Sequence, residues 1–276
     1  MKLAFLYAGQ GAQHVGMGRD LYEIYPAFRQ VLDSAPVDFD LKKLCFDGPE
    51  DQLNDTRYTQ PCMVAFAAGV TALLREAGIT PDYAAGLSLG EYSALQCAGV
   101  FDAKTAISLV AFRGQAMADA VQGRPCGMAA VLGMDRDALK AVCSEASDAG
   151  VVECTNFNCP GQIVISGDAA AVDKAGELAK AAGAKRVLPL KVSGPFHTSL
   201  MAPAGDALRE KFQSVDFGSM EMPVLFNCLG DLKGEADTIP ELLEQQVQSS
   251  VYLEDTIRRL GELGVDTVVE IGPGRT

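Results

Sequence analysis

Five residues in the first third of the chain, Gly86-Leu87-Ser88-Leu89-Gly90, constrain its fold more than any other stretch. They join a short apolar run, which predicts a strand, to a segment that predicts a helix. A serine between two glycines at such a junction is typical of a nucleophile elbow, the sharp turn that exposes a catalytic hydroxyl. The N–H groups and dipole of the following helix point toward that serine, which suits acyl transfer. The pentapeptide alone also fits an ordinary glycine turn, so Ser88 is a candidate nucleophile at this stage.

Composition narrows the class of protein. With 276 residues, 48% of them hydrophobic and 21% charged, the chain is long enough for one large packed domain or for a domain that carries a smaller insert. Its net charge of −13 argues against binding to nucleic acid or to an anionic membrane. No apolar run reaches the length of a membrane-spanning helix. The short apolar stretch 1–8 enters a glycine turn, and we expect it to be a first strand rather than a secretion signal.

The eight cysteines are scattered and contain no Cys-x-x-Cys pair, and the chain has only two histidines. Neither residue type has the spacing of a metal site. Most of the cysteines lie in apolar segments, where a thiol packs as a small hydrophobic group. We therefore expect a metal-independent protein of a reducing, cytoplasmic compartment.

The order of predicted strands and helices indicates an α/β fold. Strands at 3–8, 83–86, 223–227 and 266–271 alternate with helices, which favours a mostly parallel sheet covered on both faces, as in α/β-hydrolase-like domains. The helices of this part are expected at 18–34, at 59–77 with Pro61 in the first turn, from the elbow to Gly99, at 103–120 behind an Asp102 cap, from 199 to about 212, at 239–249 and at 252–263.

The middle of the chain has a different order of predicted strands and helices. Strands are predicted at 127–132, 151–157, 162–166 and 186–190, and helices at 135–147 and 168–182. The order β-α-β-β-α-β is that of ferredoxin-like α+β domains. We therefore expect a small ferredoxin-like domain at 125–191, inserted into a large catalytic domain made of residues 1–124 and 192–276.

Arg113 occupies an unusual place for a charged residue. Ala106, Val110, Arg113 and Met117 fall on one face of the helix predicted at 103–120, so the guanidinium lies in an apolar stripe. A buried charge requires a partner or access to water. Two partners for Arg113 remain open. One is an acidic residue in a structural salt bridge. The other is an anion supplied by a substrate, which arginine can bind through two parallel hydrogen bonds.

A serine nucleophile requires a base, and the chain offers only His14 and His197. His14 lies in a glycine-rich polar loop, whereas His197 follows Pro195-Phe196 at the start of a helix and is the better candidate. No acidic residue has the position of a third triad member, so we expect a dyad whose imidazole is held by a backbone or amide carbonyl. The loop Gly9-Gln10-Gly11-Ala12-Gln13, taken alone, is most simply an ordinary turn.

Six stretches together resemble one family, the malonyl-CoA:acyl-carrier-protein transacylases, which load fatty-acid and polyketide synthesis. The resemblance runs almost from end to end. Its stretches are Gly9-Gln10-Gly11-Ala12-Gln13, Gly86-Leu87-Ser88-Leu89-Gly90-Glu91-Tyr92, Arg113-Gly114-Gln115-Ala116-Met117, Asn156-Phe157-Asn158-Cys159-Pro160-Gly161-Gln162, Gly194-Pro195-Phe196-His197 and Glu270-Ile271-Gly272-Pro273-Gly274.

The resemblance implies roles for individual residues. Ser88 would be the nucleophile, His197 its base, and the N–H groups of Gln10 and Leu89 the oxyanion hole, which replaces the ordinary-turn reading of the first loop. Arg113 would bind the malonyl carboxylate. The remaining substrate-binding positions are Met117, Phe196, whose ring would leave little room for an α-methyl group, and Gln246, which matches a glutamine whose carbonyl holds the histidine.

The resemblance also implies a ping-pong reaction and a partner. A malonyl-Ser88 ester would form from malonyl-CoA as coenzyme A leaves, and the malonyl group would then pass to the phosphopantetheine thiol of an acyl carrier protein, with the coenzyme A thioester as a substrate and no cofactor. The carrier would dock near Lys185, Arg186 and Lys191, although a solvated strand edge explains these charges equally well. We expect a monomer.

Three departures from the family pattern stand out. The family usually has histidine where Leu87 stands, and its Pro-Val-x-Trp stretch is replaced by Ser250-Val251-Tyr252-Leu253. Relatives also continue beyond Arg275-Thr276 into another helix, which implies a shortened C-terminus. Two alternative functions remain open, namely an acyl hydrolase on the same scaffold and a non-catalytic module that docks carrier protein.

Overall fold

The computed structural model describes residues 1–190 and 194–274. Within them a parallel sheet has the order β2-β1-β9, an antiparallel sheet has the order β4-β5-β3-β6, and β7 pairs with β8. The strands are β1 (Leu3–Tyr7), β2 (Tyr83–Gly86), β3 (Cys126–Leu132), β4 (Val152–Cys159), β5 (Gln162–Asp168), β6 (Arg186–Pro189), β7 (Leu225–Phe226), β8 (Asp231–Leu232) and β9 (Thr267–Ile271).

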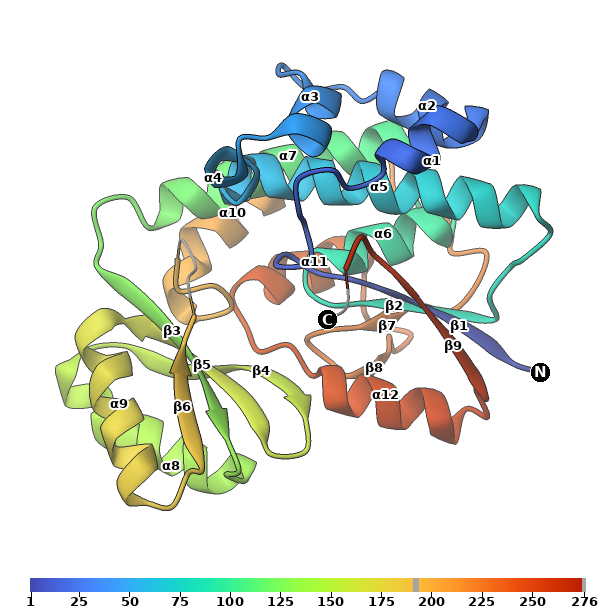
Figure 1. The fold of residues 1–276 in the computed structure, drawn as a ribbon. Helices are drawn as coiled ribbons and strands as arrows, with labels where there is room; N and C mark the ends of the chain where they lie inside the picture. The colour runs from blue at the N-terminus through green and yellow to red at the C-terminus, as the bar shows by residue number, and fades with distance from the viewer. Residues whose placement is uncertain (191–193, 275–276) are drawn as a thin grey trace.

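Helices lie on both faces of the parallel sheet and on one face of the antiparallel sheet (Figure 1). The α-helices are α1 (Arg19–Ile24), α2 (Pro26–Asp33), α3 (Leu41–Asp47), α4 (Glu50–Leu53), α5 (Thr56–Glu76), α6 (Gly90–Cys97), α7 (Ala103–Ala120), α8 (Arg136–Ala146), α9 (Ala169–Ala181), α10 (Ala202–Phe212), α11 (Ile239–Val247) and α12 (Leu253–Glu262). Two short 3-10 helices are η1 (Ser147–Ala149) and η2 (Ser199–Met201).

The parallel sheet forms the centre of the larger part of the molecule. β1 lies between β2 and β9, and Ala84 of β2 also bridges to Val224, just before β7. Helices α5 and α6 lie over one face of this sheet and α12 lies under the other (Figure 1). Phe5, Tyr7 and Ala84 are fully buried, as expected for a parallel sheet covered on both faces. The predicted α/β fold with a parallel sheet is confirmed.

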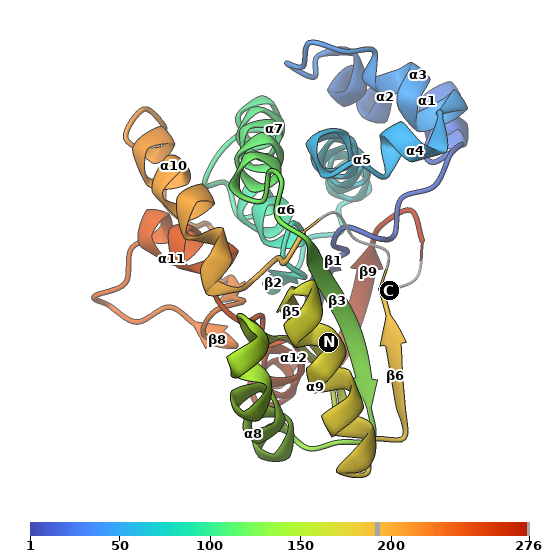
Figure 2. The same ribbon diagram turned by 90° about the vertical axis from the view of Figure 1, so that its left-hand side faces the viewer.

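A contiguous segment of the chain, residues 126–189, forms a second unit. Its elements follow the predicted order β-α-β-β-α-β, and α8 and α9 pack on one face of its sheet (Figure 2). Val131, Phe157 and Ile165 belong to the core beneath these helices. On the other face, Met128 and Val164 join the core of the larger part, so the second unit shares a packed interface with it.

Two contacts fix the second unit against the end of the chain. The backbone of Val251 exchanges hydrogen bonds with β4, donating to the Thr155 carbonyl at 2.8 Å and accepting from the Phe157 N–H at 2.9 Å. Arg136 of α8 forms ion pairs with Glu254 and Asp255 of α12. Val251, five residues after Gln246, is therefore held directly by the second unit.

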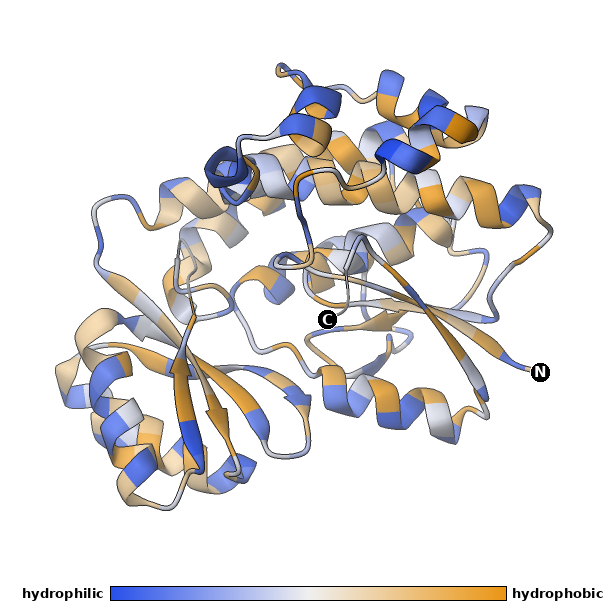
Figure 3. Cartoon of the chain, viewed as in Figure 1, coloured by the Kyte–Doolittle hydropathy of each residue, from blue (hydrophilic) through white to orange (hydrophobic). Residues whose placement is uncertain are grey.

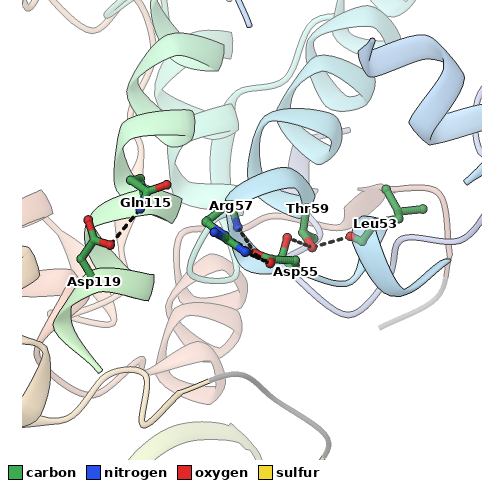
Figure 4. A network of polar contacts seen from close by, with 6 residues as sticks. All are labelled: Leu53, Asp55, Arg57, Thr59, Gln115 and Asp119. Carbon is green, nitrogen blue, oxygen red and sulfur yellow. Dashed lines mark hydrogen bonds and ion pairs between the residues drawn. The ribbon is translucent and has the colours of Figure 1, made fainter. Parts of the chain in front are cut away.

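Three details differ from the prediction. The helix expected at 18–34 is broken at Tyr25, because the residue before a proline disfavours the helical conformation. Helix α5 begins three residues early, behind an Asp55 cap (Figure 4), so Pro61 lies inside the helix and not in its first turn. The sequence analysis also missed α3, α4 and β8, which are short elements with little periodicity to detect.

Hydrophobic residues line the strands of both sheets and the buried face of α5, whereas α12 carries a hydrophilic outer face (Figure 3). No helix among residues 1–190 and 194–274 is long and apolar enough to span a membrane.

Candidate active site

The turn after β2 places Ser88 in a strained backbone conformation. Its φ angle is 51°, in the left-handed region that non-glycine residues seldom adopt. The flanking glycines allow this, since a Cβ on Gly86 would lie 2.0 Å from the Gly90 carbonyl carbon, and one on Gly90 would lie 2.2 Å from the Tyr7 carbonyl oxygen. The sequence 86–90 therefore folds as the sharp strand-to-helix turn that its spacing predicts.

His197 meets this serine from a loop 109 residues further along the chain. Its Nε2 lies 2.7 Å from Ser88 Oγ, and its Nδ1 lies 2.8 Å from the backbone carbonyl oxygen of Gln246. A carbonyl can only accept, so Nδ1 carries the proton and Nε2 is free to accept from the serine hydroxyl. Burial and the nearby Arg113 charge lower the pKa of His197 to about 4, which keeps the imidazole neutral near pH 7.

Arg113 reaches the same serine from α7. Its side chain is 1% exposed, and Nη2 donates to Ser88 Oγ at 3.2 Å and to Oε1 of Gln246 at 3.0 Å, while Nη1 donates to Oε1 of Gln60 at 2.9 Å. Nε has no partner, and no ion pair to Arg113 is present in the described part of the chain. The buried guanidinium is thus held by neutral groups, which contradicts the structural salt bridge considered for it.

Two backbone N–H groups beside Ser88 remain available. Leu89 directly precedes α6, and Gln10 lies in the loop after β1. Neither N–H donates to another described residue. Both residues line the cavity that contains Ser88.

The cavity at Ser88 has a volume of about 190 Å³ and lies between the two parts of the molecule. From the larger part it is lined by Ser88, His197, Arg113, Gln10, Leu89, Met117, Phe196, Leu87 and Gly9. The second unit contributes Met128, Asn156, Asn158, Val164 and Leu190. The polar atoms of the dyad and the arginine thus face a small, largely apolar chamber, which suits a short acyl group.

Gln246 lies behind this cavity and is absent from its lining. Its backbone carbonyl holds His197, and its side-chain Nε2 donates to the Ser88 carbonyl oxygen at 2.8 Å while Oε1 accepts from Arg113. The residue therefore contacts Ser88, His197 and Arg113 without lining the cavity.

The sequence analysis missed Asn227, which braces the elbow. Its Oδ1 accepts from the Ser88 N–H and its Nδ2 donates to the Gly86 carbonyl, both at 2.6 Å. Its own N–H donates to Oε2 of Glu91, a fully buried carboxyl group whose pKa burial raises to about 8. A polar residue at the end of the predicted strand 223–227, at the same edge of the sheet as the elbow, was the available signal.

The remaining predicted positions lie elsewhere. Lys185 and Arg186 are exposed at β6, the edge strand of the second unit, whose end leads to the cavity-lining Leu190. Lys191 lies outside the described residues, as does the end of the chain at Arg275-Thr276. Among the described residues no group of histidine, cysteine and carboxylate side chains could hold a metal ion.

Comparison with known proteins places this geometry in a family. The model of the acyl transferase domain matches residues 4–274. The malonyl CoA-acyl carrier protein transacylase of Bacillus subtilis is 45% identical, over 99% of this chain and 87% of that protein, and the enzyme of the same name from Escherichia coli K12 is 39% identical, over 99% and 90%.

Solved structures agree with the fold throughout. MCAT from Streptococcus pneumoniae superposes with a TM-score of 0.94 at 45% identity, covering 99% of this chain and 90% of that one. A malonyl-transacylase solved in complex with its type II PKS acyl-carrier protein superposes with a TM-score of 0.96 at 40% identity, covering 100% and 90%.

Proposed function

We propose that this chain, which belongs to the family of acyl transferase domains, transfers a malonyl group from malonyl-CoA to an acyl carrier protein. One observation carries the proposal. A single oxygen, Ser88 Oγ, lies 2.7 Å from the basic nitrogen of His197 and 3.2 Å from an otherwise unneutralised guanidinium. In a malonyl ester of Ser88 the free carboxylate is only two bonds from the ester carbonyl carbon, so a cation this close fits a short dicarboxylic acyl group.

The steps follow from these positions. Ser88 Oγ attacks the thioester carbonyl of malonyl-CoA as His197 Nε2 takes its proton, and the oxyanion accepts from the N–H groups of Gln10 and Leu89. The carbon–sulfur bond then breaks, and the imidazolium returns the proton to the coenzyme A thiolate. The phosphopantetheine thiol of the carrier attacks the malonyl-Ser88 ester in the same way, which releases Ser88 and the malonyl thioester. No cofactor takes part.

The pocket walls are proposed to set acyl selectivity. Arg113 binds the malonyl carboxylate, and Met117 and Phe196 limit the space around the acyl α-carbon. One methyl group of crowding alters discrimination by roughly 1–3 kcal/mol, so methylmalonyl would be disfavoured rather than excluded.

The function is tested by intact-protein mass spectrometry after mixing with malonyl-CoA and then with holo carrier protein. We expect a malonyl adduct that is absent in Ser88→Ala and moves onto the carrier. Arg113→Ala should lose malonyl loading and gain relative activity toward acetyl-CoA, whereas the exposed Arg258→Ala should load normally. An adduct lost to water at one rate with or without carrier would identify a hydrolase, and no adduct at all would favour a docking module.

Carrier docking is proposed along β6. Lys185 and Arg186 supply positive charge to an otherwise acidic protein, on a strand that leads to the cavity. A Lys185→Glu/Arg186→Glu variant should slow the discharge of malonyl-Ser88 onto the carrier while leaving its formation from malonyl-CoA unchanged. An equal effect on both steps would contradict this docking site.

Finer features of the architecture are part of the same proposal. We assign residues 1–124 and 192–276 to an α/β-hydrolase-like domain and residues 125–191 to a ferredoxin-like insert, which the strand order β4-β5-β3-β6 supports. The eight free cysteines support a reducing, cytoplasmic location. The enzyme is proposed to act as a monomer.

A further inference from the structure

Two buried side chains on α5 connect Arg113 to the loop that carries Gln10. Nη1 of Arg113 donates to Oε1 of Gln60 at 2.9 Å, and Nε2 of Gln60 donates to Oγ1 of Thr56 at 2.9 Å. Oγ1 of Thr56 in turn donates to Oε1 of Gln10 at 2.8 Å. The four side chains form one continuous chain of hydrogen bonds, which we call the α5 relay.

The α5 relay has only one possible direction. A guanidinium can only donate, so the Gln60 amide must turn its oxygen toward Arg113 and its NH2 group away. That NH2 group is also satisfied on its other side, by Met117 Sδ at 3.3 Å. Gln60 and Thr56 are almost fully buried, so water does not compete for the bonds that join Arg113, Gln60 and Thr56. Gln60 therefore has no alternative orientation that satisfies its neighbours.

The chemical identity of Gln60 matters as much as its position. A neutral amide holds the guanidinium in place and leaves its charge intact for a substrate anion. A carboxylate at the same point would form an ion pair with Arg113 and would compete with the anion that the cavity has to bind.

We propose that Gln60 and Thr56 are positioning residues that hold the carboxylate-binding end and the oxyanion end of the site at a fixed separation. The inference rests on the proposed function, since it takes Arg113 as the ligand of the acyl carboxylate and the Gln10 N–H as an oxyanion donor. Arg113 and the Gln10 N–H must contact the same short acyl group at the same time. The α5 relay connects them through α5 and not through the elbow.

The first test replaces Gln60 by glutamate. Gln60→Glu should lower kcat/KM for malonyl loading at least tenfold and lower acetyl loading less than threefold, so that the malonyl-over-acetyl preference falls. The matched control is Gln115→Glu, which adds the same charge two residues from Arg113 on the exposed face of α7 (Figure 4) and should keep the wild-type preference. An unchanged preference in Gln60→Glu, or an equal change in the control, would overturn the assignment.

The second test interrupts the α5 relay without touching Arg113. Thr56→Val should slow loading from malonyl-CoA and acetyl-CoA alike, by about tenfold, with less than a threefold change in KM, and Thr56→Ser should recover at least half of the rate. The control Thr59→Val removes another buried hydroxyl from α5, one that donates to the Leu53 carbonyl at 2.6 Å (Figure 4). Thr56→Ala replaces Thr56→Val if the latter does not fold.

The outcomes separate the two proposals. Equal loading rates in Thr56→Val and Thr59→Val at equal melting temperature would show a purely structural hydroxyl and would refute the positioning role. A wild-type protein that forms no malonyl-Ser88 ester would instead refute the proposed function.

Discussion

The elbow and the Arg113 side chain meet at Ser88 Oγ, yet they are held in place by different means. The elbow is fixed through its backbone, by two glycines without space for a side chain and by Asn227, which binds a peptide group on each side of Leu87. Arg113 is fixed through its side chain, by two neutral amides and the Ser88 hydroxyl.

The difference follows from what each group has to do. A nucleophile must stay at one point, and a strained φ angle persists only where the surrounding backbone leaves no alternative. Under the proposed function Arg113 receives a substrate anion and must keep its charge, and a carboxylate partner would neutralise that charge. Burial accordingly lowers the pKa of Arg113, because desolvation outweighs the nearby acidic groups. We expect the substrate carboxylate to offset this cost.

Gly90→Ala should have the largest effect on stability and loading, because it disrupts the elbow, the region that is fixed through its backbone. The new Cβ would meet the Tyr7 carbonyl, a backbone atom that cannot move aside, so we expect a loss of about 3 kcal/mol or more in the free energy of unfolding and no malonyl loading. Thermal melting and adduct formation are the measurements. Gly261→Ala on α12, where nothing lies within 4 Å, is the control and should be near neutral; equal melting temperatures for both would contradict the packing argument.

Asn227→Ala should come next. It leaves the Ser88 N–H and the Gly86 carbonyl without partners, and each orphaned buried group costs about 1–3 kcal/mol. We expect a lower melting temperature and a loading rate reduced by a factor on the order of 100 as the elbow relaxes. Asn54→Ala, at an exposed asparagine that binds Gln13, should change neither quantity. Normal loading in Asn227→Ala would show that glycine packing alone holds Ser88.

The pH dependence of acylation should reveal how the two regions interact. Because burial, and after it the Arg113 charge, lowers the pKa of His197 to about 4, kcat/KM for a neutral ester such as p-nitrophenyl acetate should fall only as the pH drops through about 4. In Arg113→Met this acid limb should move to higher pH, since one of the causes of the low pKa is removed. An acid limb near pH 6.5 in both proteins would indicate that neither burial nor the arginine acts on the histidine.

Glu91→Gln should affect loading least and alter mainly how stability depends on pH. The folded-state pKa of Glu91, about 8, lies above the unfolded value of about 4.5, so the folded protein binds the extra proton between these limits. The free energy of unfolding should therefore fall as the pH rises through this window in the wild type, and should fall less in Glu91→Gln. Denaturant unfolding at pH 5, 7 and 8.5 measures this, and parallel curves for both proteins would count against a buried, neutral Glu91.

Local patterns in the sequence predicted the elbow well, because the residues that form the turn itself lie between Tyr83 and Glu91. The two glycines, the strand before them and the helix after them are all neighbours along the chain. Arg113 was likewise visible, since a charge in an apolar stripe violates helical patterning.

The groups that hold these residues were harder to predict. Gln60 breaks an apolar stripe of α5 as Arg113 does on α7, but a neutral amide is a weaker signal than a charge. Asn227 acts 139 residues from Ser88, and only the family resemblance pointed to a carbonyl of Gln246, since a backbone carbonyl has no sequence signature of its own. The early start of α5 depended on the Asp55 cap, which the apolar pattern alone did not reveal.

The pairing of β9 with β1 has a consequence for the order in which the chain folds. The strands of residues 126–189 find their partners within that segment, so this unit can form its core early in synthesis. β1 can pair with β2 earlier, but its other edge is completed only by β9, where Leu3 pairs with Thr267. The Ala8 N–H, which leads into the loop that carries Gln10, donates to the Ile271 carbonyl at the end of β9. Contacts this distant in sequence form slowly. We therefore expect the nascent chain to remain inactive on the ribosome until its last strand closes the sheet.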